Sequence, residues 1–332
     1  VLIRLLEAYS PTGREKEAES VLLHIAEELG LEAQADEVGN VVAKRGDGGD
    51  VWLVGHYDTI LGELPVRVEG NIISGRGAVD AKGPLAAMLV AASISDRPVT
   101  VAALVGEEGD SRGARHLLKS ELPSYVIIGE PSNTTGVIIA YRGGARIRLK
   151  CRAAGGHSSS PGDSAVEKLL QFIAVVKELA PGTSYDEPSA AITVIRGGEN
   201  PNVLPKEAYA LVDLRVPLNS SPITLVDEMR GKRPENCQLE VDWFVEPVSV
   251  RPSDPVPRAL VRSILSLGAK PKLLRKYGSS DMNLLYSRVR SIAAYGPGDG
   301  RLAHTDEEEV SIEDLEFAVR VYARAIEQLS SL

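Results

Sequence analysis

Cysteine is scarce in this chain of 332 residues, which contains only Cys151 and Cys237. Two cysteines cannot form a disulfide framework, and they are too few for a cysteine-based metal site. The chain also lacks any apolar run approaching the roughly 20 residues that a membrane-spanning helix needs. No basic and then apolar segment of the secretory kind stands near Val1. These absences lead us to expect a cytoplasmic protein that does not enter a membrane.

Positive charge is also in the minority, since the formal net charge is −9. This balance argues against a general nucleic-acid binder. One strand-like run is a local exception, with basic residues at even-numbered positions: Arg142, Arg146, Arg148, Lys150 and Arg152. The period of two places them on one face of a strand. That face is either an ordinary solvated surface or a docking surface for an acidic partner.

The length suits two domains, and 43% hydrophobic residues allow a large core. The first part alternates helix and strand. We expect helices at 1–8, from 10 or 12 to 29, at 83–95 and at 111–120, and strands at 38–44, 51–55, 100–105 and 125–129. This alternation is typical of an α/β fold with a largely parallel sheet.

The pattern changes between about residues 143 and 248. Strands at 145–153, 190–196, 207–216 and 238–246, with helices at 164–179 and 223–231, predict a ferredoxin-like βαββαβ unit. The α/β pattern then resumes, with helices at 256–267 and 312–329 and strands at 272–276 and 291–295. We therefore predict a discontinuous catalytic domain, 1–142 and 249–332, interrupted by an inserted domain, 143–248.

A spaced set of histidines and acids follows the apolar strands of the discontinuous domain. Its members are His56 and Asp58 in VGHYDT, Asp80 in GAVDAKG, Glu107 and Glu108 in VGEEG, Glu130 in IGEPS, and His304 in AHTD. Parallel sheets bind ligands at the carboxyl ends of their strands. These residues are therefore candidates for a single site.

The residue types fit a site for two metal ions. Zinc accepts histidine nitrogen and carboxylate oxygen, and two close dications need several negative ligands. His56 and Asp58 are two positions apart and point the same way, so Asp58 can accept the ring N–H that His56 does not use for metal. Glu107 and Glu108 diverge, which allows one to ligate metal while the other serves as a general base.

Each candidate also has an ordinary explanation when taken alone. His56 could be a buried histidine, Asp80 a helix N-cap, Glu107 and Glu108 a solvated pair, and Glu130 a turn residue, while His304 alone is uninformative. These explanations are nearly independent, whereas the ordered combination is not expected by chance. The combination therefore favours a metal site. His24 and His116 lie in helical stretches without acidic motifs, and we expect them to be structural.

The order and local sequences of these motifs resemble the metallohydrolase family that contains acetylornithine deacetylase, succinyl-diaminopimelate desuccinylase, aminoacylase and related carboxypeptidases. The resemblance implies a zinc-peptidase-like catalytic domain with an inserted lid and dimerisation domain. It implies two divalent ions, zinc or alternatively cobalt, and a cis peptide after Asp80. The roles it implies are His56 and Glu130 on one ion, Glu108 and His304 on the other, Asp80 bridging, Asp58 orienting His56, and Glu107 as the base.

The inserted domain carries further matches to the family. GGHSSS at 155–160 implies that His157 acts as an oxyanion donor in the neighbouring subunit of a homodimer. GGENPNVLP at 197–205 implies that Asn202 contacts substrate. Arg215 matches an arginine that binds substrate anions, although an ion pair with Asp213 or Glu207 is the alternative. Ser279 and Arg142 are two more candidates for substrate contact.

The segment YGSSDMN at 277–283 stands where desuccinylases carry TSDGR, and Asn283 replaces the arginine. This departure argues against succinyl-diaminopimelate. The tail YGPGDGRLAH at 295–304 is similar to a compact archaeal and thermophilic branch of hydrolases in lysine and arginine biosynthesis. That branch releases lysine or ornithine from the terminal glutamate of an acidic amino-group carrier protein. Asp281 or Asp299 would then meet the ammonium group of lysine.

Two other functions remain open. A deacetylase of small N-acyl amino acids, such as acetylornithine or acetyl-lysine, or a dipeptidase would use the same site. A metal-free binding homologue is the alternative that is not an enzyme.

Overall fold

The computed structural model describes residues 1–182 and 184–332, which divide into two compact units. The first unit comprises Val1–Ala140, Val250–Arg275 and Ser280–Leu332, and the second comprises Tyr141–Ser249 and Lys276–Ser279. The sequence placed the boundaries at 142/143 and 248/249, within two residues of these. It did not indicate that residues 276–279 belong with the second unit.

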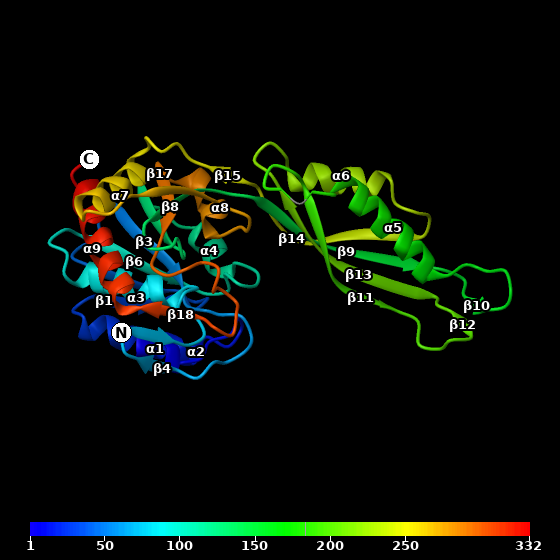
Figure 1. Cartoon of the computed structure of the whole chain (residues 1–332), viewed down its shortest axis with the longest axis horizontal. Coiled ribbons are helices and arrows are strands. Elements are labelled where there is room, and N and C mark those ends of the chain that lie inside the picture. The colour runs from blue at the N-terminus through cyan, green and yellow to red at the C-terminus, as the bar shows by residue number, and fades with distance from the viewer. Residues whose placement is uncertain (183) are drawn as a thin grey trace. The chain divides into compact units, whose positions relative to one another are not determined.

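A central mixed sheet organises the first unit (Figure 1). Its strands follow the order β1 (Glu32–Ala35), β2 (Val41–Arg45), β6 (Val99–Leu104), β3 (Val51–His56), β7 (Tyr125–Gly129), β17 (Ser291–Tyr295), β8 (Gly136–Tyr141) and β15 (Val248–Ser249), with β16 (Lys272–Lys276) also pairing with β8. β6, β3, β7 and β17 are parallel, while β1, β2 and β8 run antiparallel to their neighbours. The predicted α/β class with a mostly parallel central sheet is confirmed.

Helices cover this sheet. They are α1 (Leu2–Glu7), α2 (Lys16–Glu28), α3 (Lys82–Ser93), α4 (Arg112–Leu117), α7 (Pro255–Ser266), α8 (Asp281–Leu285) and α9 (Ile312–Leu329), with a 3-10 turn η1 (Tyr286–Arg288). α3 is buried on all sides except at Val90 and Ser93, as expected for a helix that is apolar all round. α9 packs against α3 and α7. No described helix is long and apolar enough to cross a membrane.

One helix begins later than the sequence suggested. We expected its start at Ser10 or Thr12, but α2 begins at Lys16. The two hydroxyl groups are used elsewhere, because Ser10 Oγ donates to Tyr57 O at 2.6 Å and Thr12 Oγ1 donates to Asp58 Oδ2 at 2.7 Å. Residues 10–15 therefore form a turn that contacts the segment after β3.

A small antiparallel sheet was not anticipated. It joins β4 (Arg67–Glu69) and β5 (Ile72–Ser74) to β18 (Glu309–Ser311), which lies far along the chain. Strands of three residues are too short for a period of two to register in the sequence. Their pairing brings the segment before Asp80 beside the segment after His304.

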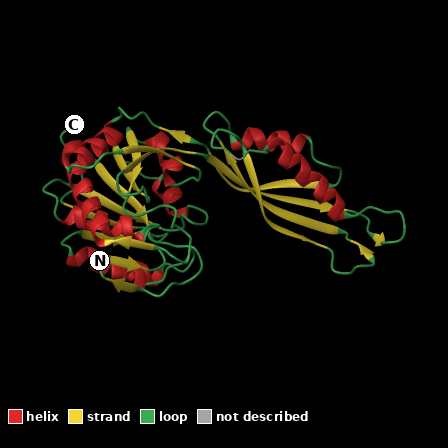
Figure 2. Cartoon of the chain, viewed as in Figure 1, coloured by secondary structure: helices red, strands yellow, loops and turns green. Residues whose placement is uncertain are grey.

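The second unit has the predicted βαββαβ order. β9 (Gly143–Arg152), β11 (Ser189–Gly197), β13 (Glu207–Val216) and β14 (Cys237–Val245) form an antiparallel sheet in the order β11-β13-β9-β14. Figure 2 shows α5 (Ala165–Leu179) and α6 (Pro222–Gly231) on one face of it. Leu169, Phe172 and Val176 of α5 belong to the buried core on that face. Two two-residue strands, β10 (Gly156–His157) and β12 (Val203–Leu204), pair with each other in a separate small sheet.

The two cysteines form one disulfide bond, which the sequence analysis did not anticipate. Cys151 on β9 lies directly opposite Cys237 on the edge strand β14. The bond joins residues 86 positions apart. It therefore closes a covalent loop that contains most of the second unit.

Removal of this bond should destabilise the second unit. A disulfide over such a loop limits the unfolded chain, so Cys151→Ser with Cys237→Ser should lower the free energy of unfolding by about 2–4 kcal/mol. Urea unfolding with and without reductant measures this change. The reductant should not affect the double variant, which serves as the control. Two thiols titrating in denatured, unreduced protein would contradict the bond itself.

Candidate metal centre

Three parallel strands present the acidic motifs at one edge of the first unit's sheet. β3 ends at His56, β6 ends shortly before Glu107 and Glu108, and β7 ends directly before Glu130. These strands are parallel neighbours in the order β6-β3-β7, so their carboxyl ends lie side by side at the same edge of the sheet. Because these strand ends are adjacent, His56 and Glu130 lie close together although they are 74 positions apart in the sequence.

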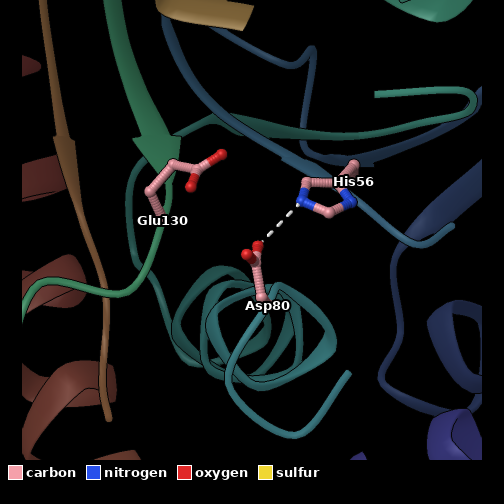
Figure 3. Close-up of side chains that lie close together, drawn as sticks. All are labelled: His56, Asp80 and Glu130. Carbon is pink, nitrogen blue, oxygen red and sulfur yellow. Dashed lines mark hydrogen bonds and ion pairs between the residues drawn. The ribbon is translucent and has the colours of Figure 1, made fainter. Parts of the chain in front are cut away.

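Asp80 and His304 reach the same place from loops. Asp80 precedes the start of α3, and the Asp80–Ala81 peptide is cis, as the family resemblance implies. His304 lies between β17 and β18 with a positive φ of 65°. Figure 3 shows His56, Asp80 and Glu130 pointing toward one another.

The ligand atoms form overlapping groups in which all atoms lie within 4.8 Å of one another. The groups are His56 with Asp80 and Glu130, His56 with Glu107 and Glu108, and Asp80 with Glu108 and His304. Asp80 belongs to the first and third groups, which together hold the five residues predicted as ligands. Nitrogen and carboxylate donors without sulfur suit zinc and similar divalent ions.

The hydrogen bonds of His56 define its tautomer. Its Nδ1 lies 3.0 Å from the main-chain oxygen of Asp58, and a carbonyl can only accept, so Nδ1 carries the proton. Nε2 lies 3.3 Å from Asp80 Oδ1 (Figure 3). Burial acts to lower the pKa of His56, but Asp58 and Asp80 raise it well above its usual value, so without metal Nε2 donates to Asp80. A bound metal ion would replace this proton and leave Nδ1–H on the main-chain oxygen of Asp58.

The structure corrects the contact that we predicted for the Asp58 carboxylate. We expected its carboxylate to accept the ring N–H of His56, but Oδ1 lies 3.6 Å from Nδ1 and the main-chain oxygen takes that bond. The carboxylate oxygens instead accept the backbone N–H groups of Glu107 at 3.0 Å and Glu108 at 3.2 Å. Asp58 is fully buried. Burial acts to raise its pKa, but the nearby His56 ring and the hydrogen bonds from Thr12 and Glu107 outweigh burial and lower it.

Glu107 and Glu108 both hold their protons more tightly than free glutamate. Burial raises the pKa of Glu107 well above its usual value, and the negative charge of Glu130 adds to this effect. Burial also raises the pKa of Glu108, even though His304 Nε2 lies 2.6 Å from its Oε1. The crowding of carboxylates at this edge therefore favours bound positive charge, whether protons or metal ions.

His304 is held between two carboxylates. Its Nε2 lies 2.6 Å from Glu108 Oε1 and 3.4 Å from Asp80 Oδ2. The hydrogen bond to Glu108 raises the pKa of His304 to about 9, against the opposing effect of burial. The ring therefore carries a proton at neutral pH unless another cation replaces it.

Asp281 lies near this group, and we predicted it only as a possible partner of lysine's ammonium group. It is buried, and its Oδ1 has no hydrogen-bond partner among the described residues. Burial raises its pKa to about 7. The other candidate, Asp299, forms an exposed ion pair with Arg301 at 2.5 Å. Asn283, where desuccinylases carry arginine, accepts the Ser280 N–H at 2.9 Å in a capping box of α8.

Two predicted residues of the second unit meet on a short ribbon. β10 pairs with β12, and the Ser158 N–H donates to Asn202 O at 3.0 Å. His157 is exposed, with Nδ1 2.8 Å from Ser159 Oγ. His157 and Asn202 are therefore neighbours within the second unit.

The other three candidates form a separate cluster in the second unit. Arg215 donates to Ser279 Oγ at 3.0 Å and pairs with Asp213 at 2.9 Å, which is the ion pair considered as an alternative. Arg142 is buried, and its guanidinium donates to the main-chain oxygens of Glu187 and, at 2.9 Å, Arg215. Arg142 therefore holds the main chain at Arg215.

The basic run on β9 is not the open positive surface that was considered. Arg142 is buried and does not belong to it. Three of the others form ion pairs with acids on neighbouring strands: Arg148 with Asp242 at 3.1 Å, Lys150 with Glu240 at 2.8 Å and Arg152 with Glu207 at 3.2 Å. These pairs offset the charge of the three residues, which favours the ordinary solvated surface over the docking surface.

Comparison with known proteins gives matches over nearly the whole chain. Residues 52–328 match the profile of peptidase family M20/M25/M40. A putative [LysW]-lysine/[LysW]-ornithine hydrolase of Pyrobaculum aerophilum is 41% identical, covering 98% of this chain and 95% of that protein. The [LysW]-lysine/[LysW]-ornithine hydrolase of Sulfurisphaera tokodaii is 36% identical, covering 99% and 94%.

Solved structures share the fold at lower identity. A tripeptidase from Staphylococcus aureus has a TM-score of 0.85 at 20% identity, covering 100% of this chain and 97% of that one. An M20 family metallo-carboxypeptidase from Sulfolobus solfataricus has a TM-score of 0.83 at 18% identity, covering 100% and 98%. These similarities confirm the predicted architecture.

The raised pKa values predict how the stability of the metal-free protein depends on pH. Glu107, Glu108 and His304 bind protons more tightly when folded, so their stabilisation is present at low pH and is lost as pH rises through the folded pKa values. With chelator present, the thermal midpoint should therefore fall as the pH rises from about 4.5, the ordinary glutamate value, to about 7. Above pH 7 the loss from His304, whose pKa is about 9, is opposed by buried Lys82, whose pKa is lowered to about 7. Asp58, with its lowered pKa, acts below this window.

Saturating zinc should remove this fall, because bound dications replace the protons. Unfolding scans at pH 5, 7 and 9, with chelator and with zinc, test both statements. A midpoint in chelator that rises between pH 5 and pH 7 would contradict the assignment.

Proposed function

Because the chain belongs to peptidase family M20/M25/M40, we propose that it is a metal-dependent amide hydrolase that releases lysine or ornithine from LysW, an acidic amino-group carrier protein. The bond cleaved joins the amino acid to the carrier's terminal glutamate, in lysine and arginine biosynthesis. The substrate assignment rests on the identity of 36–41%, over nearly the full length, to relatives named for this activity. The observation that carries the chemistry is the pair of ligand groups that share Asp80.

The ligand set fits two divalent ions. We assign His56 and Glu130 to one ion, Glu108 and His304 to the other, and Asp80 to both. Zinc is the expected metal and cobalt the alternative. When bound, the pair would polarise the scissile carbonyl and make a water more acidic.

Glu107 is assigned as the general base. Its raised pKa suits a group that takes a proton from water and then donates it to the leaving amine. Asp58 holds the main chain at Glu107 and Glu108, so the base and a ligand are fixed by one carboxylate. This separation of tasks between adjacent glutamates is the basis of the proposed mechanism.

His157 is assigned as the oxyanion donor, acting in the partner subunit of a homodimer formed through the second unit. Its ring is exposed on the β10–β12 ribbon, and the contact with Ser159 engages Nδ1, which leaves Nε2 free to donate a proton. Asn202 on the same ribbon and Arg215 beside Ser279 are assigned to substrate contact. Arg142 is assigned to position Arg215, whose main-chain oxygen it binds, and it remains a candidate for substrate contact.

The substrate assignment predicts a preference for the carrier. The kcat/KM for LysW-linked lysine or ornithine should exceed that for acetyl-lysine or acetylornithine by at least about tenfold, equivalent to about 1.4 kcal/mol of transition-state binding. Amino-acid analysis after incubation with zinc or cobalt measures both products. Equal rates on free acetylornithine would favour the small-molecule deacetylase. Protein that binds no divalent ion by elemental analysis would favour the binding homologue.

The assignments of Glu107 and His157 predict complementation between subunits. Glu107→Gln and His157→Gln should each be inactive alone, and Glu107→Gln should keep its metal by elemental analysis. Equal mixing should restore about a quarter of the wild-type sites, because half of randomly formed dimers are mixed and each has one complete site. The double variant Glu107→Gln/His157→Gln, mixed equally with wild type, is the control. Its mixed dimers hold no complete site, so activity should fall to the quarter of sites in wild-type homodimers, below the half that independent subunits would keep. If the two single variants form dimers yet recover no activity on mixing, the action of His157 in the partner subunit is wrong.

A further inference from the structure

A buried ion pair lies directly behind Asp80 and is used by none of the roles assigned above. Arg76 is 5% exposed and Glu308 is 1% exposed, and Arg76 Nη1 lies 3.0 Å from Glu308 Oε2. Neither residue belongs to a described ligand group. A buried pair of this kind is weak evidence for a gain in stability, because desolvation of both charges opposes their attraction. Its contacts therefore decide what it does.

Glu308 holds the main chain that carries the shared carboxylate. Its Oε1 accepts the backbone N–H of Val79 at 3.1 Å and that of Asp80 at 3.0 Å. Its own main-chain oxygen accepts the Gly75 N–H at 3.1 Å. One side chain, 228 positions away in the sequence, thus fixes the backbone at Asp80.

Arg76 holds the loop that carries His304. The same Nη1 that contacts Glu308 donates to the main-chain oxygen of Thr305 at 2.8 Å, and Nε donates to Gly62 O at 2.8 Å. Thr305 directly follows His304. The planar guanidinium therefore connects the Asp80 segment, through Glu308, to the residue next to His304.

We propose that Arg76 and Glu308 are positioning residues that set the separation of Asp80 and His304, and so the geometry of the metal site formed by Asp80, Glu108 and His304. This inference rests on the proposed function, because it needs that group to bind a metal ion. His56 and Glu130 receive their positions from the ends of β3 and β7 instead. Loss of the pair should therefore weaken the site that contains both Asp80 and His304 more than the other site, which shares only Asp80 with it.

Glu308→Gln is the first test. The glutamine oxygen can still accept the N–H groups of Val79 and Asp80, but its amide N–H group would face the N–H groups of Arg76. Arg76→Lys is the second test, since lysine keeps the charge and loses the fork that reaches Thr305. Thr100→Val is the matched control, because it removes a buried hydrogen bond of 2.9 Å to Gly48 O at the opposite end of β6.

Zinc stoichiometry and affinity, measured by chelator competition, are the main readouts. In both test variants the affinity for the ion of the Asp80, Glu108 and His304 group should fall by about 10- to 100-fold, the range for groups that orient metal ligands. The affinity for the other ion, which shares only Asp80, should fall clearly less. The visible spectrum of the cobalt-loaded protein should change as well. At saturating metal, kcat on LysW-linked lysine should fall with KM nearly constant. Thr100→Val should leave all these values unchanged.

Wild-type affinity and an unaltered cobalt spectrum in both test variants would overturn the inference. An equal loss of both ions, matched by an equal fall of the thermal midpoint, would also overturn it in favour of a general structural role. Wild-type protein that binds two ions but does not release lysine or ornithine would instead contradict the proposed function. The affinity comparison still tests the positioning role in that case.

Discussion

Mutual repulsion among buried carboxylates is the constraint on which this structure depends. Oxygens of Asp80, Glu108 and Glu130 lie within the groups of atoms that approach to 4.8 Å. Two unit charges at such a distance repel by roughly 3–4 kcal/mol even at an effective dielectric constant of about 20. The fold can keep them together only because cations or protons are bound among them, and the raised pKa values of Glu107, Glu108 and His304 express this requirement.

Much of the fold was predictable because its signals are local. The apolar strands β7 and β13 and the amphipathic helix α9 were predicted with the bounds that the structure has, and the inserted βαββαβ order was also correct. The missed elements, such as β4, β10 and α8, are too short to show a periodic pattern. Their positions depend on contacts with distant segments, which the sequence does not reveal.

The candidate site was likewise predictable only in part. The residue types and their order identified the groups around Asp80, because chemistry restricts which side chains can hold metal. The atoms that orient those residues were not predictable. Asp58 engages the N–H groups of Glu107 and Glu108 with its carboxylate, and Glu308, within a run of three glutamates that resembles a solvated stretch, is almost completely buried. The sequence also could not show that acids on neighbouring strands pair with the basic residues of β9.

The disulfide between β9 and β14 has a consequence for how the chain tolerates cleavage. It ties Cys151 to Cys237, and the ribbon with His157 and Asn202 lies between them. A protease that cuts an exposed turn anywhere within this stretch leaves both pieces joined through sulfur. The ribbon can therefore be nicked without its fragments separating, until a reductant opens the ring.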